Sequence, residues 1–424
     1  MKKLLLLNIG ILLLSCIHGQ TNYAYEEAIA KAGLFHLQKK YKDAILYYEK
    51  AFQLQQPDGL TAYKAASIYS LDSNIEKAFY YIDLALQSGW QEANMLATDP
   101  YFDYLRKAAL QKWEHIIETA DIVEREREKK LNLPFLRRQI NKMALNDQRL
   151  RYARIQANTK DERRKIAREI YLADSGNRAE AKTILNRYGW PKLSDIGKDG
   201  QNNFWLLVQH ADDDVLFQQK ALAAMEKLRS TKEIDLENYV FLYDRVQCNL
   251  NYKQLYGTQV NWGAHGEASG FRNIIHEDMV DERRKALGLL PLKIYALSYG
   301  FVYNSISALQ AKENDSLDLA KTHRLIDSAN YSYTRDEFQK VYDYYNSASM
   351  IMGGMSAAEN FEAAILFAKI AAKDNNPQYR SISLDFLNLL YLRRDLTKTK
   401  LRSQKPFKIL YNEPRWIEIY DHLN

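Results

Sequence analysis

The fold is decided by YKDAILYYEKAFQLQQP, residues 41–57, because its pattern returns 34 residues later in IEKAFYYIDLALQSGW, residues 75–90. Small residues agree at this fixed offset, as Ala44 does with Ala78. The apolar residues of the first segment recur with a period of about 3.6, which is typical of an amphipathic helix. A repeat of this length therefore predicts stacked pairs of antiparallel helices.

The small and aromatic positions of this repeat resemble the tetratricopeptide repeat. It departs from that pattern at Ala28 and Lys31, where a larger aromatic residue and a leucine are usual. The resemblance implies a concave surface that grips a peptide or protein segment. The residues expected to line this groove are Phe35, Tyr41, Tyr48, Tyr63 and Tyr69. Because two repeats cannot cover their own open end, we expect 97–110 to act as a cap.

A related pattern closes the chain. Residues 361–377 overlay on 41–57 with Ala364 on Ala44 and Pro377 on Pro57. The sequence therefore predicts a second block of helical hairpins at the C-terminus.

These patterns together predict an all-α fold, with tetratricopeptide-like hairpins, a mainly helical middle domain with a few irregular loops, and a C-terminal helical hairpin block. The expected divisions are 1–19 for an export signal, 20–112 for the repeats and cap helix, 113–157 for long charged linker helices broken at Pro134, 158–300 for the middle domain and 301–424 for the C-terminal block. Within the middle domain we expect helices over 161–173, 177–188, 201–228, 235–250 and 279–287.

The first residues read as a targeting segment. Lys2 and Lys3 precede an apolar run over 4–14 that is too short to span a bilayer. The stretch LLSC resembles a bacterial lipobox, which would leave Cys16 lipidated, whereas IHGQ at 17–20 resembles a cleavage site that releases a soluble protein. Both alternatives stay open, so the protein is expected to be periplasmic or a membrane-anchored lipoprotein.

Cysteine usage and charge exclude several classes. Cys16 and Cys248 are the only cysteines, so no disulfide is expected within the mature chain. The net charge is +6, but basic and acidic residues alternate, as in DIVEREREKK, so nucleic acid is not an expected partner. HExxH, CxxC, the Walker glycine-lysine motif and G-x-S-x-G do not occur, and no metal or cofactor is expected.

The middle of the chain carries a second resemblance. The segments GWP, SDIG, QHADDD, YDRV, YGTQ and VDERRKALGL follow one another between 189 and 289. This order resembles an uncharacterised bacterial domain of unknown function that often accompanies tetratricopeptide-like repeats in exported proteins. The resemblance brings no known activity.

The same segments supply candidate site residues. A helix-borne His210 beside Asp244 has the chemistry of a general base. Arginine forks hold carboxylates or phosphates well, and the loop YGTQVNWGAHGEASG, 256–270, offers polar groups. The candidate ligand-binding residues are Arg245, Tyr256, Thr258, Gln259, Arg283 and Arg284. The competing interpretation is a histidine satisfied in the core and arginines that form salt bridges between helices.

Two functions follow from these patterns. The first is a non-catalytic, exported helical-repeat scaffold that binds a protein or peptide partner in the bacterial cell envelope, touching the membrane only through a lipid anchor. The alternative is a small-ligand-binding or hydrolytic middle domain with a pocket around His210, Asp244, Arg245 and 256–259. A third interpretation makes the middle domain a rigid spacer.

Overall fold

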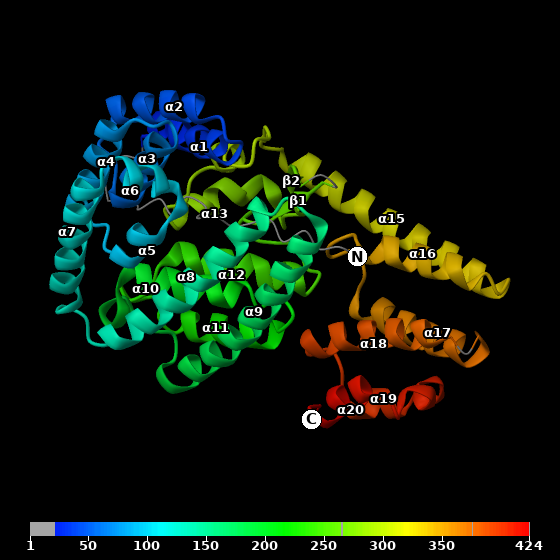
Figure 1. The fold of residues 1–424 in the computed structure, drawn as a ribbon. Helices are drawn as coiled ribbons and strands as arrows, with labels where there is room; N and C mark the ends of the chain where they lie inside the picture. Colours follow the sequence, from blue (N-terminus) through cyan, green and yellow to red (C-terminus); the bar gives the residue numbers. More distant parts are fainter. Residues whose placement is uncertain (1–21, 264–265, 375, 424) are drawn as a thin grey trace.

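The computed structural model describes residues 22–263, 266–374 and 376–423, and over these residues the predicted all-α class is confirmed (Figure 1). The predicted export signal and Cys16 lie outside the described residues. Apolar side chains gather in three cores, one for each of the N-terminal, middle and C-terminal parts of the chain.

The N-terminal block consists of paired helices. They are α1 (Tyr23–Leu37), α2 (Tyr41–Leu54), α3 (Gly59–Leu71) and α4 (Ile75–Gln87). Helices α1 and α2 pack together, as do α3 and α4. Ala44, Ala51, Ala78 and Ala85 are all buried, because small residues let the helix axes approach. The 34-residue period therefore corresponds to a hairpin repeat.

The segment predicted to act as a cap is helical. It comprises α5 (Ala93–Thr98), the 3-10 helix η1 (Pro100–Phe102) and α6 (Asp103–Ala108). Phe102 and Leu105 are fully buried in the N-terminal core. Pro100 opens η1, where its missing N–H has no cost.

Three long helices lead into the middle of the chain, namely α7 (Leu110–Glu128), α8 (Pro134–Gln156) and α9 (Lys160–Tyr188). The predicted break at Pro134 is confirmed, because that proline begins α8. The expected interruption between 173 and 177 is wrong, and α9 runs through Gly176. A glycine inside a helix weakens it by about 1 kcal/mol, which packing over 29 residues offsets.

The next helices are α10 (Leu193–Gln209), α11 (Val215–Glu226) and α12 (Leu236–Asn249). The single helix expected over 201–228 is wrong. It is broken at 210–214, where Asp214 caps α11 by accepting a hydrogen bond from the Phe217 N–H. His210 therefore lies at the C-terminal end of α10 and not within a continuous helix.

The loop after α12 contains a small sheet that the sequence did not predict. Strands β1 (Val260–Trp262) and β2 (Ala268–Phe271) pair antiparallel, with Val260 opposite Phe271. The 3-10 helix η2 (Glu277–Met279), α13 (Val280–Ala286) and α14 (Leu292–Leu297) follow. A turn at 298–300 and an irregular segment, 301–307, then lead to the C-terminal block.

The C-terminal block consists of α15 (Ala308–Thr334), α16 (Phe338–Ser349), α17 (Ala357–Asp374), α18 (Pro377–Leu392), α19 (Lys398–Arg402), η3 (Lys405–Leu410) and α20 (Pro414–Asp421). The pairs α15–α16 and α17–α18 are hairpins, as predicted. Ala364, Ala371 and Trp416 are buried in its core.

Specific polar contacts join the three parts. Arg137 on α8 is 1% exposed, and its guanidinium contacts Glu124 and Glu128 on α7 and Asp199 on α10 at 2.6–2.8 Å. It also donates to the Gln91 carbonyl of the N-terminal block. At the other junction, Arg393 donates to the carbonyls of Leu250 and Asn251 after α12.

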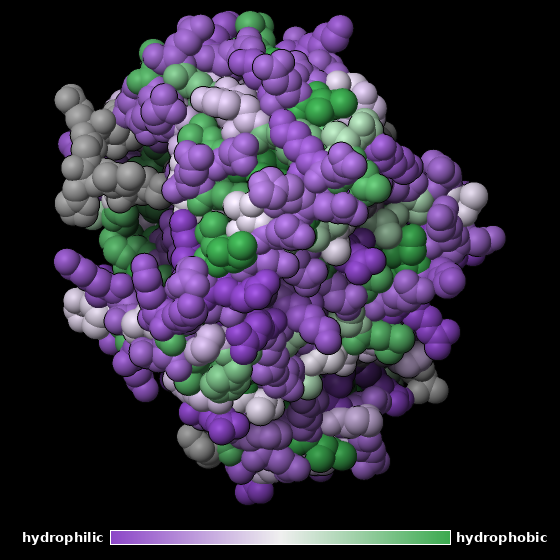
Figure 2. All heavy atoms as spheres, turned by 60° about the vertical axis from the view of Figure 1, so that its left-hand side comes forward, coloured by the Kyte–Doolittle hydropathy of each residue, from purple (hydrophilic) through white to green (hydrophobic). Residues whose placement is uncertain are grey.

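The surface on the side of the N-terminal block is largely polar. Figure 2 shows apolar side chains there in small, separate groups among hydrophilic ones. None of the helices in the described part of the chain combines the length and the apolarity needed to cross a membrane.

Candidate functional site

Helix α12 presents two neighbouring candidates to different surroundings. Consecutive helical residues point about 100° apart. Asp244 therefore faces the loop that follows the helix, whereas Arg245 faces the turn between α10 and α11. The predicted pocket around His210, Asp244 and Arg245 divides into two clusters.

The first cluster is centred on Asp244, which is fully buried. Its carboxylate accepts hydrogen bonds from the backbone N–H groups of Leu255, Tyr256 and Thr258 at 2.8–3.2 Å, and from the Thr258 hydroxyl at 3.0 Å. Burial raises the pKa of Asp244, and these hydrogen bonds oppose that shift. The carboxylate is thus occupied in shaping the loop.

The two candidate arginines secure the same loop from the other side. Arg284 is buried and donates to the carbonyls of Tyr256 and Leu290, at 2.7 and 2.5 Å. Arg283 donates to the Leu255 carbonyl at 2.9 Å and to two further carbonyls at 275 and 276. Burial lowers the pKa of both guanidinium groups. Both guanidinium groups thus donate to backbone carbonyls instead of to an anionic ligand.

The loop residues themselves are mostly enclosed. Tyr256 and Thr258 are buried, and Gln259 is half-buried with its amide donating to the Thr258 hydroxyl. Gly257 has a φ of 71°, and a Cβ there would lie 2.8 Å from Leu292, so this turn requires glycine. We call Asp244, the loop 254–259, Arg283 and Arg284 the Asp244 centre.

Arg245 belongs to the second cluster. Its guanidinium forms a two-pronged ion pair with Asp212, with N–O distances of 2.7 and 2.5 Å. Burial by itself raises the pKa of Asp212, but the charge of Arg245 and hydrogen bonds from Asn249 and Gln218 outweigh burial and hold it at about 2. This pair fixes the 210–214 turn against α12.

His210 contacts a carboxylate that the sequence did not single out. Its Nδ1 lies 3.1 Å from Asp147 on α8, and both side chains are buried. Arg151 links Asp147 to Asp174 on α9, with N–O distances of 2.8 and 2.7 Å. Burial lowers the pKa of His210, although Asp147 opposes that shift. The His210 imidazole is therefore neutral, and its Nδ1–H donates to Asp147.

The Asp147 carboxylate and its partners have the chemistry of a metal site. Among the described residues, Asp147, Asp174 and His210 are the one group whose ligand atoms all lie within 4.8 Å of one another. The Arg151 guanidinium already contacts both carboxylates and supplies the positive charge that a metal ion would bring. The donor set therefore fits a salt-bridged brace of α8, α9 and α10 better than a metal ion.

A pair of surface hollows has none of these candidates among its lining residues. Two adjoining hollows of about 260 and 310 Å³ share Asn273 and Glu277, and we call them together the trough. The first is lined by Lys253, Asn273, Ile274, Glu277, Ile306, Ala311, Asn314, Asp315, Leu317 and Asp318. The second is lined by Ser269, Gly270, Phe271, Arg272, Asn273, Glu277, Phe301, Val302, Tyr303 and Asn304.

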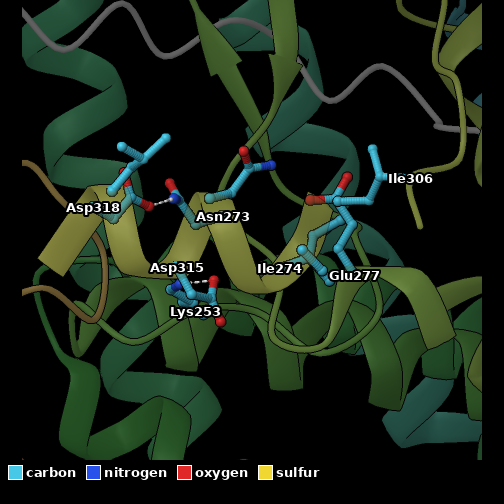
Figure 3. A pocket seen from close by; sticks show the side chains of 10 residues that line it. Lys253, Asn273, Ile274, Glu277, Ile306, Asp315 and Asp318 are labelled. Atoms are coloured by element: carbon cyan, nitrogen blue, oxygen red, sulfur yellow. Dashed lines mark hydrogen bonds and ion pairs between the residues drawn. The ribbon is translucent and has the colours of Figure 1, made fainter. Parts of the chain in front are cut away.

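Figure 3 shows the first hollow, with side chains from α15 facing those of the segment after β2. Lys253 contacts Asp315 at 2.5 Å, and Asn273 donates to Asp318 at 2.6 Å. Glu277 accepts a hydrogen bond from the Tyr303 hydroxyl at 3.1 Å. Burial, and then the charge of Asp315, raise the pKa of Glu277. The hollow is thus rich in carboxylates.

The predicted groove residues of the N-terminal block have mixed positions. Tyr48, Tyr63 and Tyr69 are buried in the core, where Tyr63 stacks on Trp90 and donates to Asp99. These three rings fill the space between helices and offer no surface to a partner. Phe35 and Tyr41 are half-buried.

The lone described cysteine is inert. Cys248 is buried, and burial raises the pKa of its thiol to about 12. A thiol that stays protonated at neutral pH is a poor nucleophile.

Sequence reasoning missed Asp147, Arg151 and Asp174, as well as most of the trough. The spacing of Asp147 and Arg151, four residues apart, is a signal for a helical ion pair. That spacing does not indicate that His210, which is 63 residues from Asp147 in the sequence, forms a hydrogen bond with it. No short stretch of sequence could have indicated the trough, because β2, the segment 301–306 and α15 each contribute one of its sides.

Residues 134–304 match a family described as a family of unknown function (DUF6624), so the chain contains a domain of that family. The match includes α8, which was predicted to belong to the linker, and ends within the irregular segment before α15. No curated protein and no solved structure matches the chain.

Proposed function

We propose that the protein is an exported, non-catalytic scaffold that binds a protein or peptide partner in the bacterial cell envelope, and that the trough is its binding surface. One observation carries the proposal. The polar groups of the Asp244 centre are bonded to the loop's own backbone, whereas the trough is open and lined by side chains at the surface.

We infer that α1–α4 are tetratricopeptide-like repeats that brace the 134–304 domain. The 34-residue offset between the first residues of α2 and α4, together with their buried alanines, supports this inference. Helix α1 packs against α14, and Gly300 lies against Leu34. Part of the repeat surface is thereby used inside the molecule, which favours the trough over the repeat groove as the place for a partner.

The proposal is tested with a photo-crosslinking amino acid placed in the full chain in cells. Val302 and Leu317 line the trough and are 80% and 63% exposed, whereas Ile122 on α7 is equally accessible at 59% and lies outside it. We expect one and the same polypeptide to be crosslinked from positions 302 and 317, and not from 122. Absence of any crosslinked polypeptide at the two trough positions would contradict the proposal.

A second candidate function rests on the hydrogen bond between Asp147 and His210. A carboxylate that orients an imidazole is an arrangement used by general bases. The test is thermal unfolding of the protein with divalent metals, nucleotides and sugar phosphates, since a ligand at about 100 times its Kd stabilises by about 2.7 kcal/mol. A rise in Tm that His210→Gln abolishes would favour this candidate, and an unchanged Tm with every compound would reject it.

A further inference from the structure

One wall of the second hollow is the outer edge of a sheet. Strand β2 pairs only with β1 among the described residues, and a parallel bridge between Ile274 and Gln254 begins just beyond it, so 268–271 is the part of its other edge without a strand partner there. Residues 269–273 line the hollow, and 269–271 of them lie on this edge. An unpaired strand edge presents N–H and C=O groups at the spacing of an extended chain, and adding a strand is a common mode of peptide recognition.

Another wall of this hollow is a segment without helix or strand. Residues 301–304 line it, and the backbone of 302–306 forms no hydrogen bond with any other described residue. Phe271 of β2 packs against Phe301 and Tyr303, with ring centroids 4.9 and 5.4 Å apart, which fixes the two walls relative to each other. The slot is therefore held in shape by aromatic packing and still has free polar backbone.

The floor of the adjoining hollow carries an excess of negative charge. Glu277, Asp315 and Asp318 line it, and Lys253 is the one basic side chain among its lining residues. Lys253 pairs with Asp315, and the other two carboxylates have only neutral partners, Tyr303 and Asn273. Burial and the neighbouring Asp315 carboxylate raise the pKa of Glu277, against the opposing charge of Lys253. Charge complementarity thus favours a cationic group here.

An organic cation fits this floor better than a metal ion. Among the described residues, the single group of carboxylates and histidine close enough to share a metal lies at Asp147, Asp174 and His210. The trough also has apolar side chains at its rim, since Val302 and Leu317 are largely exposed. Exposed apolar residues beside a polar groove are typical of surfaces that bind a protein segment.

We propose that the trough binds an extended peptide segment that carries a lysine or arginine side chain. The main chain of the segment adds to the free edge of β2, and its ammonium or guanidinium group enters the first hollow among Glu277, Asp315 and Asp318. This inference rests on the proposed scaffold function and names the chemistry of the partner.

The test uses the full chain and a fluorescent nine-residue peptide of alternating threonine and valine with a central arginine. Fluorescence anisotropy measures its affinity, beside peptides in which glutamine or glutamate replaces the arginine. We expect the glutamine peptide to bind about tenfold more weakly, because a charge-assisted hydrogen bond is lost. The glutamate peptide is expected not to bind, and added salt should weaken binding of the arginine peptide.

A pair of protein variants locates the site. Asp315→Asn with Asp318→Asn is expected to weaken the arginine peptide about tenfold. Glu313→Gln lies on the same helix, is exposed outside the trough and should leave affinity unchanged. A peptide with alternate amides N-methylated along one edge should lose binding, because it cannot add as a strand. Equal affinity for the arginine, glutamine and glutamate peptides, or equal loss with Glu313→Gln, would overturn the inference.

Failure of this inference is distinguishable from failure of the proposed function. If positions 302 and 317 crosslink one polypeptide while the arginine peptide shows no preference over the others, the trough binds a partner of different chemistry. If neither crosslinking nor peptide binding occurs, the scaffold function itself is wrong.

Discussion

The Asp244 centre and the trough contain similar residue types, yet they differ in what their polar groups already contact. At the Asp244 centre, one carboxylate accepts hydrogen bonds from three backbone N–H groups and a hydroxyl, and two arginines donate to carbonyls. In the trough, Asp318 has a single amide partner and borders open space. A structural polar cluster therefore differs from a binding surface in whether its polar groups already have hydrogen-bond partners within the protein, and not in its residue types.

The largest expected effect is that of Asp244→Ala. Removing the carboxylate leaves three N–H groups of the loop without acceptors, each costing about 1–3 kcal/mol when buried. We expect a loss of at least about 3 kcal/mol in the free energy of unfolding, measured by urea denaturation followed by circular dichroism. Asp327→Ala, at an exposed position on α15, is the control and should stay within about 0.5 kcal/mol of the native protein.

Asp244→Ala can abolish folding altogether, so Thr258→Val serves as a milder second variant. It removes the hydroxyl's hydrogen bond to the carboxylate and the one that it accepts from the Gln259 amide, and should cost about 1–2 kcal/mol. A change below about 0.5 kcal/mol in both variants would show that the Asp244 centre does not stabilise the fold, and the comparison would then fail.

An intermediate effect is expected at Asp174, and it depends on pH. Burial, and then the charge of Asp147, raise the pKa of Asp174 to about 7, although Arg151 opposes the shift. In the unfolded chain an aspartate titrates near pH 4. Between about pH 4 and 7 the unfolded state therefore loses this proton while the folded state keeps it, so stability falls as pH rises.

Asp174→Asn removes this titration. The full shift corresponds to about 3 kcal/mol between pH 4.5 and 8. Because Asp174 is partly exposed and solvent screens its charge, we expect the stability of the variant relative to the native protein to rise by about 2 kcal/mol over this range. Urea denaturation of both proteins across this range measures it, and the titration of His210 largely cancels in the difference. A difference that stays constant with pH, or falls, would contradict a raised pKa at Asp174.

The smallest effect on stability is expected in the trough. Asp318→Asn keeps the shape of the side chain and changes one hydrogen bond at a half-buried position. We expect the free energy of unfolding to change by less than about 1 kcal/mol in urea denaturation. A loss as large as that of Asp244→Ala would place Asp318 among the structural groups and remove the contrast between the two regions.

Much of the fold was predictable because local rules determine it. Ala44 and Ala78 had to be buried once their 34-residue offset was recognised, and Pro100 and Pro134 begin helical segments as proline at a first turn does. The break at 210–214 was not predicted, because the helical period of apolar residues continues across it. Asp214, whose side chain caps α11, nevertheless ends the helical pattern there.

The candidate site was less predictable, for a physical reason. Asp244, Arg283 and Arg284 were predicted as site residues, and they lie together at one loop, but the sequence does not show whether their partners are backbone atoms or a ligand. The sheet was not predicted because strands of three and four residues are too short to show an alternation of apolar and polar residues. The trough was not predicted because its walls come from segments up to 65 residues apart, from Lys253 to Asp318.

The position of Arg137 has a consequence for how such chains exchange parts in evolution. The family match begins at residue 134, yet two of the three carboxylates that neutralise Arg137, those of Glu124 and Glu128, precede it. A recombination event that cut the gene at this boundary would bury an arginine with only Asp199 to balance it, which is strongly destabilising. We therefore expect the middle domain to be inherited together with α7, with natural crossovers upstream of that helix.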